Sequence, residues 1–437
     1  MPQADGRRAQ LIAALQNGEQ FDTEQGVPVS ELRALNTVTW YQHALAYTVM
    51  KWPHIAAKHR ASIADALSTA SPALVRPGAT GRPAPSALRT ALYAWAFRLV
   101  LVTDKNGASV HVPRAEAEEP PTEIARALAW IAENSLPMTE AARPANIRRA
   151  LDAISRRLDG NAAAENTTRR KRMILNNAFE YAIECEQLDV NPLKRVDWRP
   201  PDTDEEVDFR FVPGPKLAKA LIQAVRDQGT RGEHLEAFFG CMYYAAMRPG
   251  EVAALKDTDL SLPDEEHADE WGEVILAESR PEVASGWTDD GLPYERRGLK
   301  RRARKATRPV PIPPELVWML REHIRRHGLA SDGRLFRAVR GGRVRSTEYC
   351  ELWQTARETV LSPEELATPL ADVPYKARHA GISLWIQAGV EPPEVARRAG
   401  HSLAVLYRVY AKILNGRQGH ANRLIAEALR DPGDDSS

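Results

Sequence analysis

One stretch divides this sequence more clearly than any other. Residues 197–215, DWRPPDTDEEVDFRFVPGP, are rich in proline and in acidic side chains. Proline removes backbone donors and ends helices, and a charged, proline-rich segment has little with which to build a core. The stretch therefore predicts a boundary between two separately folded parts of the chain.

The part before the boundary is predicted to be helical. Amphipathic patterns begin at Thr39 and recur up to a long helix that ends at Asn191 and Pro192. Residues 85–102 have apolar side chains at helical spacing and predict one helix. Residues 104–123 predict an inserted polar linker.

The part after the boundary has a mixed pattern. Residues 272–279, GEVILAES, predict a strand, and Val310 and Ile312 alternate with prolines, as in a short edge strand. The remaining segments are helical. The predicted fold class is mainly α with a small antiparallel β-sheet (α+β). The expected divisions are an amino-terminal, flexible extension at 1–34, a helical domain at 35–200, a second domain at 201–430 and a disordered tail at 431–437.

The composition excludes several classes of protein. The 437 residues include 59 basic and 58 acidic ones, so the net charge of +1 indicates no overall field for nucleic acid. Three widely spaced cysteines form no CxxC pair, which favours a reducing compartment. The first residues lack the apolar core of a signal peptide, and no apolar run could span a bilayer. We therefore expect a cytoplasmic protein with no membrane partner.

Positive charge is concentrated in two places. The start of the long helix holds Arg169, Arg170, Lys171 and Arg172. Such a cluster is either a solvated helix face or a contact with a DNA backbone. Residues 296–308 hold eight basic side chains and no acidic one. Because these charges repel one another unless an anion lies between them, this stretch is expected to contact DNA. The predicted contacts are Arg301, Arg302, Arg304 and Lys305.

Three short motifs after the boundary carry candidate catalytic residues. They are AAMRPGEVAAL at residues 245–255, YKARH at 375–379 and AGHSLAVLYRVY at 399–410. Tyr407 and Tyr410 share one face of a helix, so the local pattern alone leaves either one as a nucleophile beside His401. The sequence has no G-x-x-x-x-G-K-[ST] loop and no spaced set of carboxylates and histidines. We therefore expect no ATP, no metal and no other cofactor.

Together these motifs resemble those of the tyrosine recombinase (phage integrase) family. The first is similar to the family's A/T-G-L-R-x-G-E-L pattern and the second to its H-x-L-R-H pattern. The family's L-G-H is followed nine positions later by a tyrosine, which matches the spacing from His401 to Tyr410 and leaves Tyr407 as a neighbour. The catalytic residues that the resemblance implies are Arg248, Lys300, Arg378, His401 and Tyr410.

The resemblance also implies a fold and a reaction. Residues 35–200 would be a helical, SAM-like core DNA-binding domain, and residues 201–430 the catalytic domain. The tyrosine would attack a DNA phosphodiester, form a 3′-phosphotyrosine and be displaced by a 5′-hydroxyl, while arginines clamp the phosphate. The implied partners are double-stranded DNA attachment sites, a homotetramer on synapsed DNA and, for some members, a directionality factor. The implied function is integration or excision of a mobile element.

Two positions depart from the family pattern. The first histidine of H-x-L-R-H is Tyr375 here, and Arg302 occupies the usual lysine position six residues before Arg308. Because arginine is a poor proton donor, we expect Lys300, with Lys305 as the alternative, to protonate the leaving oxygen. The residues expected to support the site are Tyr375, Glu251 and His379. The alternative functions are a type IB topoisomerase-like strand transferase and a catalytically impaired DNA-binding relative.

Overall fold

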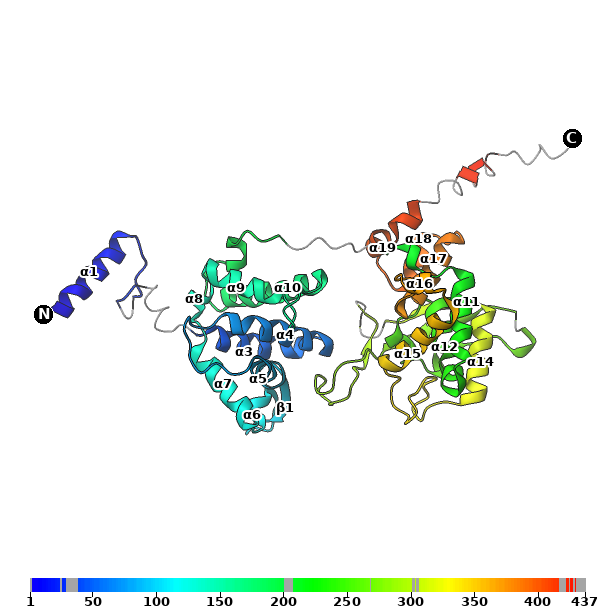
Figure 1. Ribbon diagram of the computed structural model, residues 1–437, viewed down its shortest axis with the longest axis horizontal. Coiled ribbons are helices and arrows are strands. Elements are labelled where there is room, and N and C mark those ends of the chain that lie inside the picture. Colours follow the sequence, from blue (N-terminus) through cyan, green and yellow to red (C-terminus); the bar gives the residue numbers. More distant parts are fainter. Residues whose placement is uncertain are drawn as a thin grey trace. The chain divides into compact units, whose positions relative to one another are not determined.

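Two separately packed units make up the chain in the computed structural model (Figure 1). The residues that it describes are 2–23, 26–28, 38–199, 207–267, 269–300, 303, 306–415, 422, 423, 425, 426 and 429. The first unit comprises Met1–Thr203 and Ala284–Leu292, and the second comprises Asp204–Val283 and Pro293–Ser437. The tail expected at 431–437 lies outside the described residues.

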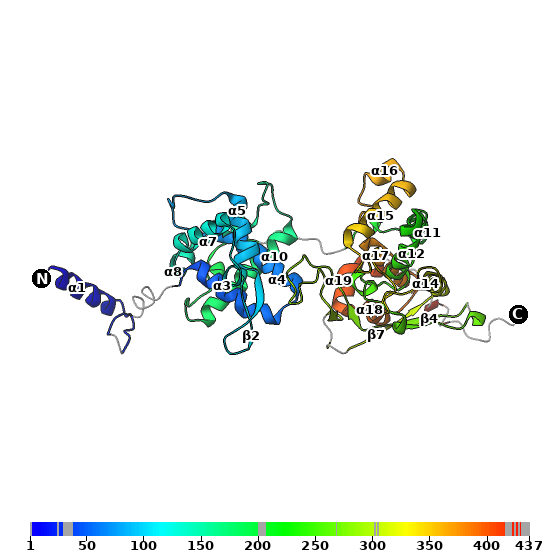
Figure 2. The ribbon, with the colours of Figure 1, turned by 90° about the horizontal axis from the view of Figure 1, so that it is seen from below.

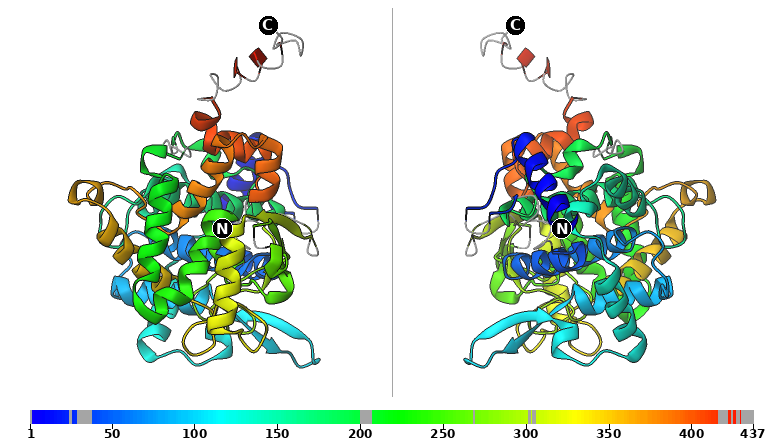
Figure 3. Two further views of the ribbon diagram at one scale, coloured as in Figure 1. Left: turned by 90° about the vertical axis from the view of Figure 1, so that its right-hand side faces the viewer. Right: turned by 90° about the vertical axis from the view of Figure 1, so that its left-hand side faces the viewer.

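The first unit contains helices and one β-hairpin. Its α-helices are α1 (Pro2–Gln16), α3 (Trp40–Lys51), α4 (Ala57–Ala70), α5 (Pro85–Thr90), α6 (Arg114–Ala117), α7 (Thr122–Asn134), α8 (Met138–Ala141), α9 (Pro144–Ile154) and α10 (Glu165–Glu184). Strands β1 (Leu99–Thr103) and β2 (Ser109–Pro113) pair antiparallel, with Leu101 opposite His111. Figure 3 shows this hairpin standing out from the helices of its unit.

The core of the first unit forms around Trp40. Thr39 begins α3 with a capping box, in which its hydroxyl accepts from the Gln42 amide and the Gln42 side chain accepts from the Thr39 amide. The buried Trp40 ring contacts Phe179 of α10 with centroids 5.0 Å apart, and its Nε1 donates to Ser71 Oγ at 3.0 Å. A large ring that also satisfies its polar atom thus joins α3 to α10.

The structure corrects the prediction for residues 85–102. The helix α5 ends at Thr90, a π-helical turn covers Ala91–Ala96, and β1 begins at Leu99. The sequence LVLVT in β1 alternates β-branched and other apolar side chains, which suits a pleated strand better than a helix. The range 104–123, expected as a polar linker, contains β2 and α6. The range 1–34, expected as a flexible extension, contains α1.

Residues 284–292 fold with the first unit although their neighbours in sequence belong to the second. Trp287 is buried, and its ring lies 5.8 Å from that of Trp52 and 5.0 Å from that of Tyr93. Arg60 donates to Asp289 Oδ1 at 2.7 Å and also to the Trp287 carbonyl. Aromatic packing and a charged hydrogen bond therefore hold this segment in the first unit.

The second unit surrounds a small antiparallel sheet with helices. Its α-helices are α11 (Pro215–Arg226), α12 (Gly229–Tyr244), α13 (Pro249–Val252), α14 (Pro314–His327), α15 (Ser346–Val360), α16 (Pro363–Leu366), α17 (Tyr375–Gln387), α18 (Pro392–Ala399) and α19 (Leu403–Asn415). Strands β3 (Leu260–Ser261), β4 (Gly272–Leu276) and β7 (Arg308–Ile312) form one sheet in that order, and β5 (Glu278–Ser279) pairs with β6 (Arg297–Gly298).

The register of the three-stranded sheet decides which side chains of β7 are buried. Strands β4 and β7 are labelled in Figure 2. Val274 of β4 lies opposite Val310 of β7, and Leu276 lies opposite Arg308. Side chains alternate along a strand, so Arg308, Val310 and Ile312 all point to the buried face. The predicted fold class, mainly α with small antiparallel sheets, is confirmed. In the described part of the chain, no helix has the length and apolar character that a membrane crossing requires.

A close contact between α12 and α17 generates a stability prediction. A Cβ added at Gly381 would collide with the carbonyl oxygen of Tyr243, so the two helix backbones would have to separate. We expect Gly381→Ala to lower the free energy of unfolding by about 1–3 kcal/mol, the usual cost of overpacking. Urea denaturation followed by circular dichroism measures the change. Gly342→Ala is the matched control, because an added Cβ there meets nothing within 4 Å.

Candidate active site

The site begins at the turn between α12 and α13. Ala246 has a φ of 45°, an uncommon value for a residue with a side chain, and Arg248 follows as the N-cap of α13. The Arg248 guanidinium donates to Glu251 Oε1 at 2.8 Å and to the Gly400 carbonyl at 3.0 Å. These two hydrogen bonds fix the direction of the arginine and connect it to the loop after α18.

Glu251 is a buried carboxylate shared by two arginines. Its side chain is 1% exposed and accepts from Arg308 Nη1 at 3.1 Å and Nη2 at 2.8 Å, besides Arg248. Burial alone would raise the pKa of Glu251, but Arg308 and Arg248 lower it to about 2. The carboxylate is therefore ionised near neutral pH and holds two cations in fixed positions.

Arg378 of α17 is the most enclosed arginine of the site, with 0% of its surface exposed. It donates to the Ala246 carbonyl and, at 2.6 Å, to the Ala399 carbonyl. Its Nη2 also lies 2.9 Å from His401 Nε2. Two backbone carbonyls and an imidazole thus orient a guanidinium that has no carboxylate of its own among the described residues.

The turn at Gly400 brings His401 to the arginines. Gly400 adopts the left-handed conformation with φ 64° and ends α18. A Cβ at this position would collide with Arg308 Nη1 and lie 3.3 Å from Arg248 Nη1. Only glycine fits both the backbone conformation and this close approach.

Several donors of this cluster have no acceptor within the described residues. His401 Nδ1 and Arg378 Nε are buried and lack a hydrogen-bond partner there. Burial, followed by Arg378 and Arg248, lowers the pKa of His401 to about 3, so its imidazole is neutral near pH 7. Because Nε2 faces an arginine donor, Nδ1 carries the proton and can donate it. Buried donors without acceptors are uncommon and indicate a place for an anion.

Tyr410 lies beside this cluster. Its side chain is 0% exposed, and its hydroxyl oxygen is 2.7 Å from His379 Nδ1. The ring centroids of His379 and His401 are 5.9 and 6.3 Å from the Tyr410 ring, and Phe209 packs on it at 5.7 Å. Burial raises the pKa of Tyr410 above its usual range. The backbone at Tyr410, with φ −118° and ψ 21°, leaves the helical conformation and forms a kink in α19.

The two tyrosines of the motif have different surroundings. Tyr407 is 51% exposed, whereas Tyr410 is enclosed with His379, His401 and Arg378. The kink of α19 separates them, because a residue outside helical geometry no longer follows the regular spacing of a helix face.

Tyr375, which stands where the family has a histidine, also lies in the cluster. Its ring packs edge-on against His379 with centroids 5.1 Å apart. The Arg378 guanidinium lies 5.9 Å from the centre of the same ring. Tyr375 thus lies against Arg378 and against the histidine next to Tyr410.

Solved structures resemble this arrangement of elements. The Tn1549 transposon integrase in complex with transposon right end DNA aligns with a TM-score of 0.51 and 17% identity, over 71% of this chain and 96% of that one. The same integrase in complex with a circular intermediate DNA gives 0.51 and 16% over the same shares. This chain has the fold of a tyrosine recombinase.

Other comparisons complete this result. The XerH site-specific recombinase bound to difH substrate aligns with a TM-score of 0.46 and 10% identity, over 86% of this chain and 97% of that one. No family sequence model matches the chain, and no curated protein matches it in sequence. At these identities, the likeness to solved structures concerns the fold.

The basic hairpin of this recombinase fold is described only in part. Lys300 follows β6 and its side chain is exposed. The predicted DNA contacts Arg301, Arg302, Arg304 and Lys305 lie outside the described residues. Within the described residues, no group of histidine, cysteine and carboxylate side chains could hold a metal ion.

The basic start of α10 divides into two pairs. Arg169 and Arg170 are exposed. Lys171 is instead buried, 3.0 Å from Thr69 Oγ1 and 3.2 Å from Asp65 Oδ2. Arg172 stacks over Trp198 at 4.9 Å. The four residues were predicted to lie on one face, but Arg169 and Arg170 are exposed, Arg172 is partly buried and Lys171 is buried.

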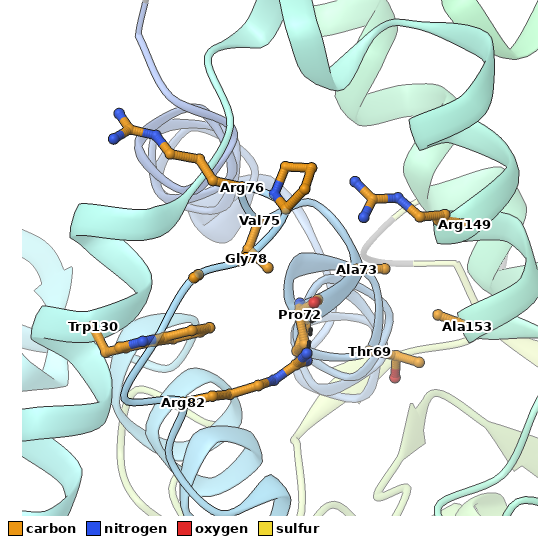
Figure 4. Close-up of a pocket in the computed structure, with 12 residues that line it drawn as sticks. Thr69, Pro72, Ala73, Val75, Arg76, Gly78, Arg82, Trp130, Arg149 and Ala153 are labelled. Carbon is orange, nitrogen blue, oxygen red and sulfur yellow. Dashed lines mark hydrogen bonds between the residues drawn. The ribbon is translucent and has the colours of Figure 1, made fainter.

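A second basic surface lies in the first unit, and we call it the arginine groove. It consists of a cavity of about 450 Å³ and an adjoining one of about 620 Å³, and Arg82 lines both. Figure 4 shows Trp130 and Arg82 on one side of the first cavity and Arg149 on the other. The groove arginines without a carboxylate partner among the described residues are Arg76, Arg82, Arg149 and Arg156. The sequence analysis missed this groove, because its members come from separate helices and loops.

Arg308 is the site residue that sequence reasoning missed. In the sequence, Arg308 was used only to count back to the usual lysine position. In the structure its side chain is 1% exposed and pairs with Glu251. The signal was the RPVPI sequence of β7. Side chains alternate along a strand, so Arg308 lies on the same buried face as Val310 and Ile312. An arginine on the apolar face of a strand requires a buried acidic partner.

The shared carboxylate generates a pH prediction. Folding lowers the pKa of Glu251 from its ordinary value near 4.5 to about 2. The ionised carboxylate therefore adds on the order of 3 kcal/mol to the free energy of unfolding. This contribution is complete above pH 4.5 and is lost as the pH falls toward 2. We expect Glu251→Gln to be strongly destabilised at pH 7 and to lose less stability than the wild type on acidification.

Denaturant unfolding of both proteins at pH 7, 4 and 3 checks this expectation. The control is Glu358→Gln, because Glu358 is an exposed carboxylate on α15 that accepts a hydrogen bond from the uncharged side chain of Gln354. Equal acid-induced losses for the wild type and Glu251→Gln would contradict the role assigned to this carboxylate.

Proposed function

We propose that this protein is a site-specific DNA recombinase that cleaves and rejoins DNA through a 3′-phosphotyrosine at Tyr410. One observation carries the proposal: the Tyr410 hydroxyl lies in the same enclosed cluster as the Arg378 guanidinium, and His401 adds a buried donor without an acceptor. An anionic phosphodiester fits these donors, and a tyrosine beside it is placed to attack phosphorus.

Each catalytic residue has a distinct part in the proposed reaction. Arg248 and Arg378 bind the non-bridging oxygens, and their charge stabilises the pentavalent transition state without a metal. His401 donates from Nδ1 to one of these oxygens. Tyr410 forms the bond to phosphorus, and Lys300 protonates the departing 5′-oxygen. In the second step, a 5′-hydroxyl of another strand attacks the phosphotyrosine and releases Tyr410.

Glu251 and Arg308 act in the proposed site by holding Arg248. The carboxylate accepts from both arginines and prevents them from repelling each other at close range. Because Tyr410 and Arg378 are both fully enclosed, a phosphate reaches them only when the surrounding segments move. Phe209, which covers the Tyr410 ring, is the side chain that this movement must displace.

The proposed biological role is integration or excision of a mobile element inside the cell. It is supported by the likeness in fold to a transposon integrase in complex with transposon right end DNA and with a circular intermediate DNA. Exchange between two double-stranded sites cleaves four strands, one tyrosine to each strand, so we propose a homotetramer on two double-stranded DNA sites. A directionality factor would select between integration and excision.

The arginine groove and the exposed start of α10 are the proposed backbone contacts of the first unit. Four groove arginines without a carboxylate partner, together with Arg169 and Arg170, would neutralise phosphates and release counterions. Lys171 would instead act inside the protein, where it pairs with Asp65, and Arg172 would pack on Trp198. In the second unit the hairpin residues Arg301, Arg302, Arg304 and Lys305 remain proposed contacts.

Covalent trapping tests the proposed nucleophile. The probe is duplex DNA from the regions flanking the gene, nicked one nucleotide from each candidate site so that cleavage releases a short fragment and cannot be reversed. We expect wild-type protein and Tyr407→Phe to form a covalent adduct visible on a denaturing gel, and Tyr410→Phe to form none. The two variants are matched, because each removes one hydroxyl from the same helix.

The possible results separate the candidate functions. An adduct that persists in Tyr410→Phe would contradict the nucleophile. Adducts without any preferred sequence, with relaxation of an arbitrary supercoiled plasmid, would favour the topoisomerase-like alternative. Binding without cleavage would favour the catalytically impaired relative.

Salt-dependent binding tests the arginine groove. On a duplex that the wild type binds, we expect Arg149→Gln to weaken affinity and to reduce the slope of log K against log salt by about 1, the value for one lost phosphate contact. Fluorescence anisotropy from about 50 to 200 mM salt measures this slope. Arg126→Gln is the control, because Arg126 is exposed on α7 and does not line the groove. Equal slopes for the two variants would exclude Arg149 as a phosphate contact.

A further inference from the structure

The hydrogen bond between Tyr410 and His379 has a chemical consequence beyond packing. His379 Nδ1 lies 2.7 Å from the Tyr410 hydroxyl oxygen, and the two residues come from different helices, α17 and α19. A phenol must lose its proton as it becomes bonded to phosphorus. In the tautomer with its proton on Nε2, His379 accepts the phenolic hydrogen at Nδ1 and is placed to take that proton.

The neighbouring groups are poor acceptors for this proton. Arg378 and Arg248 are cations without lone pairs to offer. His401 uses Nε2 to face Arg378, and its remaining nitrogen is the donor that points to the phosphate position. Tyr375 is a phenol and a weak base near neutral pH. Among these groups, His379 alone combines an available imidazole nitrogen with contact to the Tyr410 hydroxyl.

We propose that His379 is the general base of the cleavage step, and this inference rests on the proposed function. The Tyr410 oxygen forms its bond to phosphorus while its proton passes to His379 Nδ1. The bond from phosphorus to the 5′-oxygen breaks, and that oxygen takes a proton from Lys300. During rejoining, the incoming 5′-hydroxyl gives its proton to the deprotonated lysine, and Tyr410 leaves and recovers its proton from His379.

The position of His379 explains how the site functions with Tyr375 in the place of the family histidine. His379 lies four residues after Tyr375 in α17, one helical turn further along the same face. The two rings pack edge-on with centroids 5.1 Å apart, so Tyr375 supports one side of the imidazole. His379 thus offers an imidazole nitrogen to the tyrosine, while a phenol fills the first position of the motif.

Because of the charges around His379, the basicity of its imidazole depends on whether DNA is bound. Burial first, then Arg378 and Lys376, lowers the pKa of His379 to about 4. The titratable and charged groups near it are Tyr375, Lys376 and Arg378 of its own helix, His401 of the turn after α18, and Tyr410 of α19. A bound phosphodiester adds a negative charge beside Arg378, which offsets that arginine and raises the pKa of the imidazole. The base therefore becomes stronger when DNA occupies the site.

A substrate with sulfur at the leaving position tests the general base, His379, separately from the general acid, Lys300. The probe is a gene-flanking duplex that traps wild-type protein through Tyr410, made with sulfur in place of the 5′-bridging oxygen at the cleaved phosphate. Sulfur leaves without a proton, so Lys300→Ala should regain most of its lost cleavage rate on this probe. His379→Asn keeps an oxygen acceptor near the Nδ1 position but takes up no proton. We expect it to remain 10²- to 10⁴-fold slower than wild type, the usual share of general-base catalysis.

The pH profile on the same probe distinguishes a base from a residue that only positions Tyr410. For His379→Asn, the rate should rise about tenfold per pH unit, because only tyrosine that ionises by itself can attack, whereas wild type should rise less steeply. A near-wild-type rate for His379→Asn, or a slow rate with a profile parallel to wild type, would overturn the proposal. Recovery of His379→Asn on the sulfur probe would place His379 at the leaving group and would overturn it as well.

Two controls keep the test decisive. The thermal midpoint of each variant shows whether it is folded, and His379→Gln, which carries the same amide on a longer side chain, replaces His379→Asn if that variant is unfolded. Tyr407→Phe should match wild type on both probes. If wild-type protein forms no adduct with any flanking duplex, the proposed function fails, whereas an adduct with an unaffected His379→Asn refutes the general base alone.

Discussion

The carboxylate of Glu251, buried between Arg248 and Arg308, is the interaction on which the arrangement of the second unit depends. It is nearly inaccessible to water and forms hydrogen bonds to both guanidiniums. A buried charge is tolerated only when it is paired and its hydrogen bonds are satisfied. The contact joins α13 to β7, and through Arg248 it reaches the carbonyl of Gly400. Removing it would leave two arginines facing each other without a counter-charge.

Arg378 is also a buried charge, but it is held in a different way from Arg248 and Arg308. Backbone carbonyls of Ala246 and Ala399, not a carboxylate, hold it. Neutral acceptors fix the direction of a guanidinium without neutralising its charge, so that charge remains for an anionic ligand. The uncommon φ of Ala246 and the left-handed turn at Gly400 are the backbone conformations from which these neighbouring segments reach the arginine.

Short motifs predicted the members of the site better than they predicted its supports. The family resemblance implied Arg248, Lys300, Arg378, His401 and Tyr410; all of these except Lys300 lie in one cluster, and their catalytic roles remain predictions. Arg308 was missed because its burial follows from the register of β7 on β4, which no local pattern contains. Residues 85–102 have helical spacing, but the strand that begins at Leu99 is favoured by antiparallel pairing with residues 109–113. The packing of residues 284–292 in the first unit likewise depends on contacts with residues far away in the sequence, such as Arg60 and Trp52.

The enclosure of Tyr410 affects how long the proposed covalent link would survive. Water is the competing nucleophile for any phosphotyrosine, and its attack would leave a broken DNA strand. In the free protein the Tyr410 ring is fully covered, with Phe209 against one side and His379 at its hydroxyl, so water does not reach the phenol. Once these segments have moved to admit DNA, the proposed linkage would be protected from water only where they close again around the bound strand.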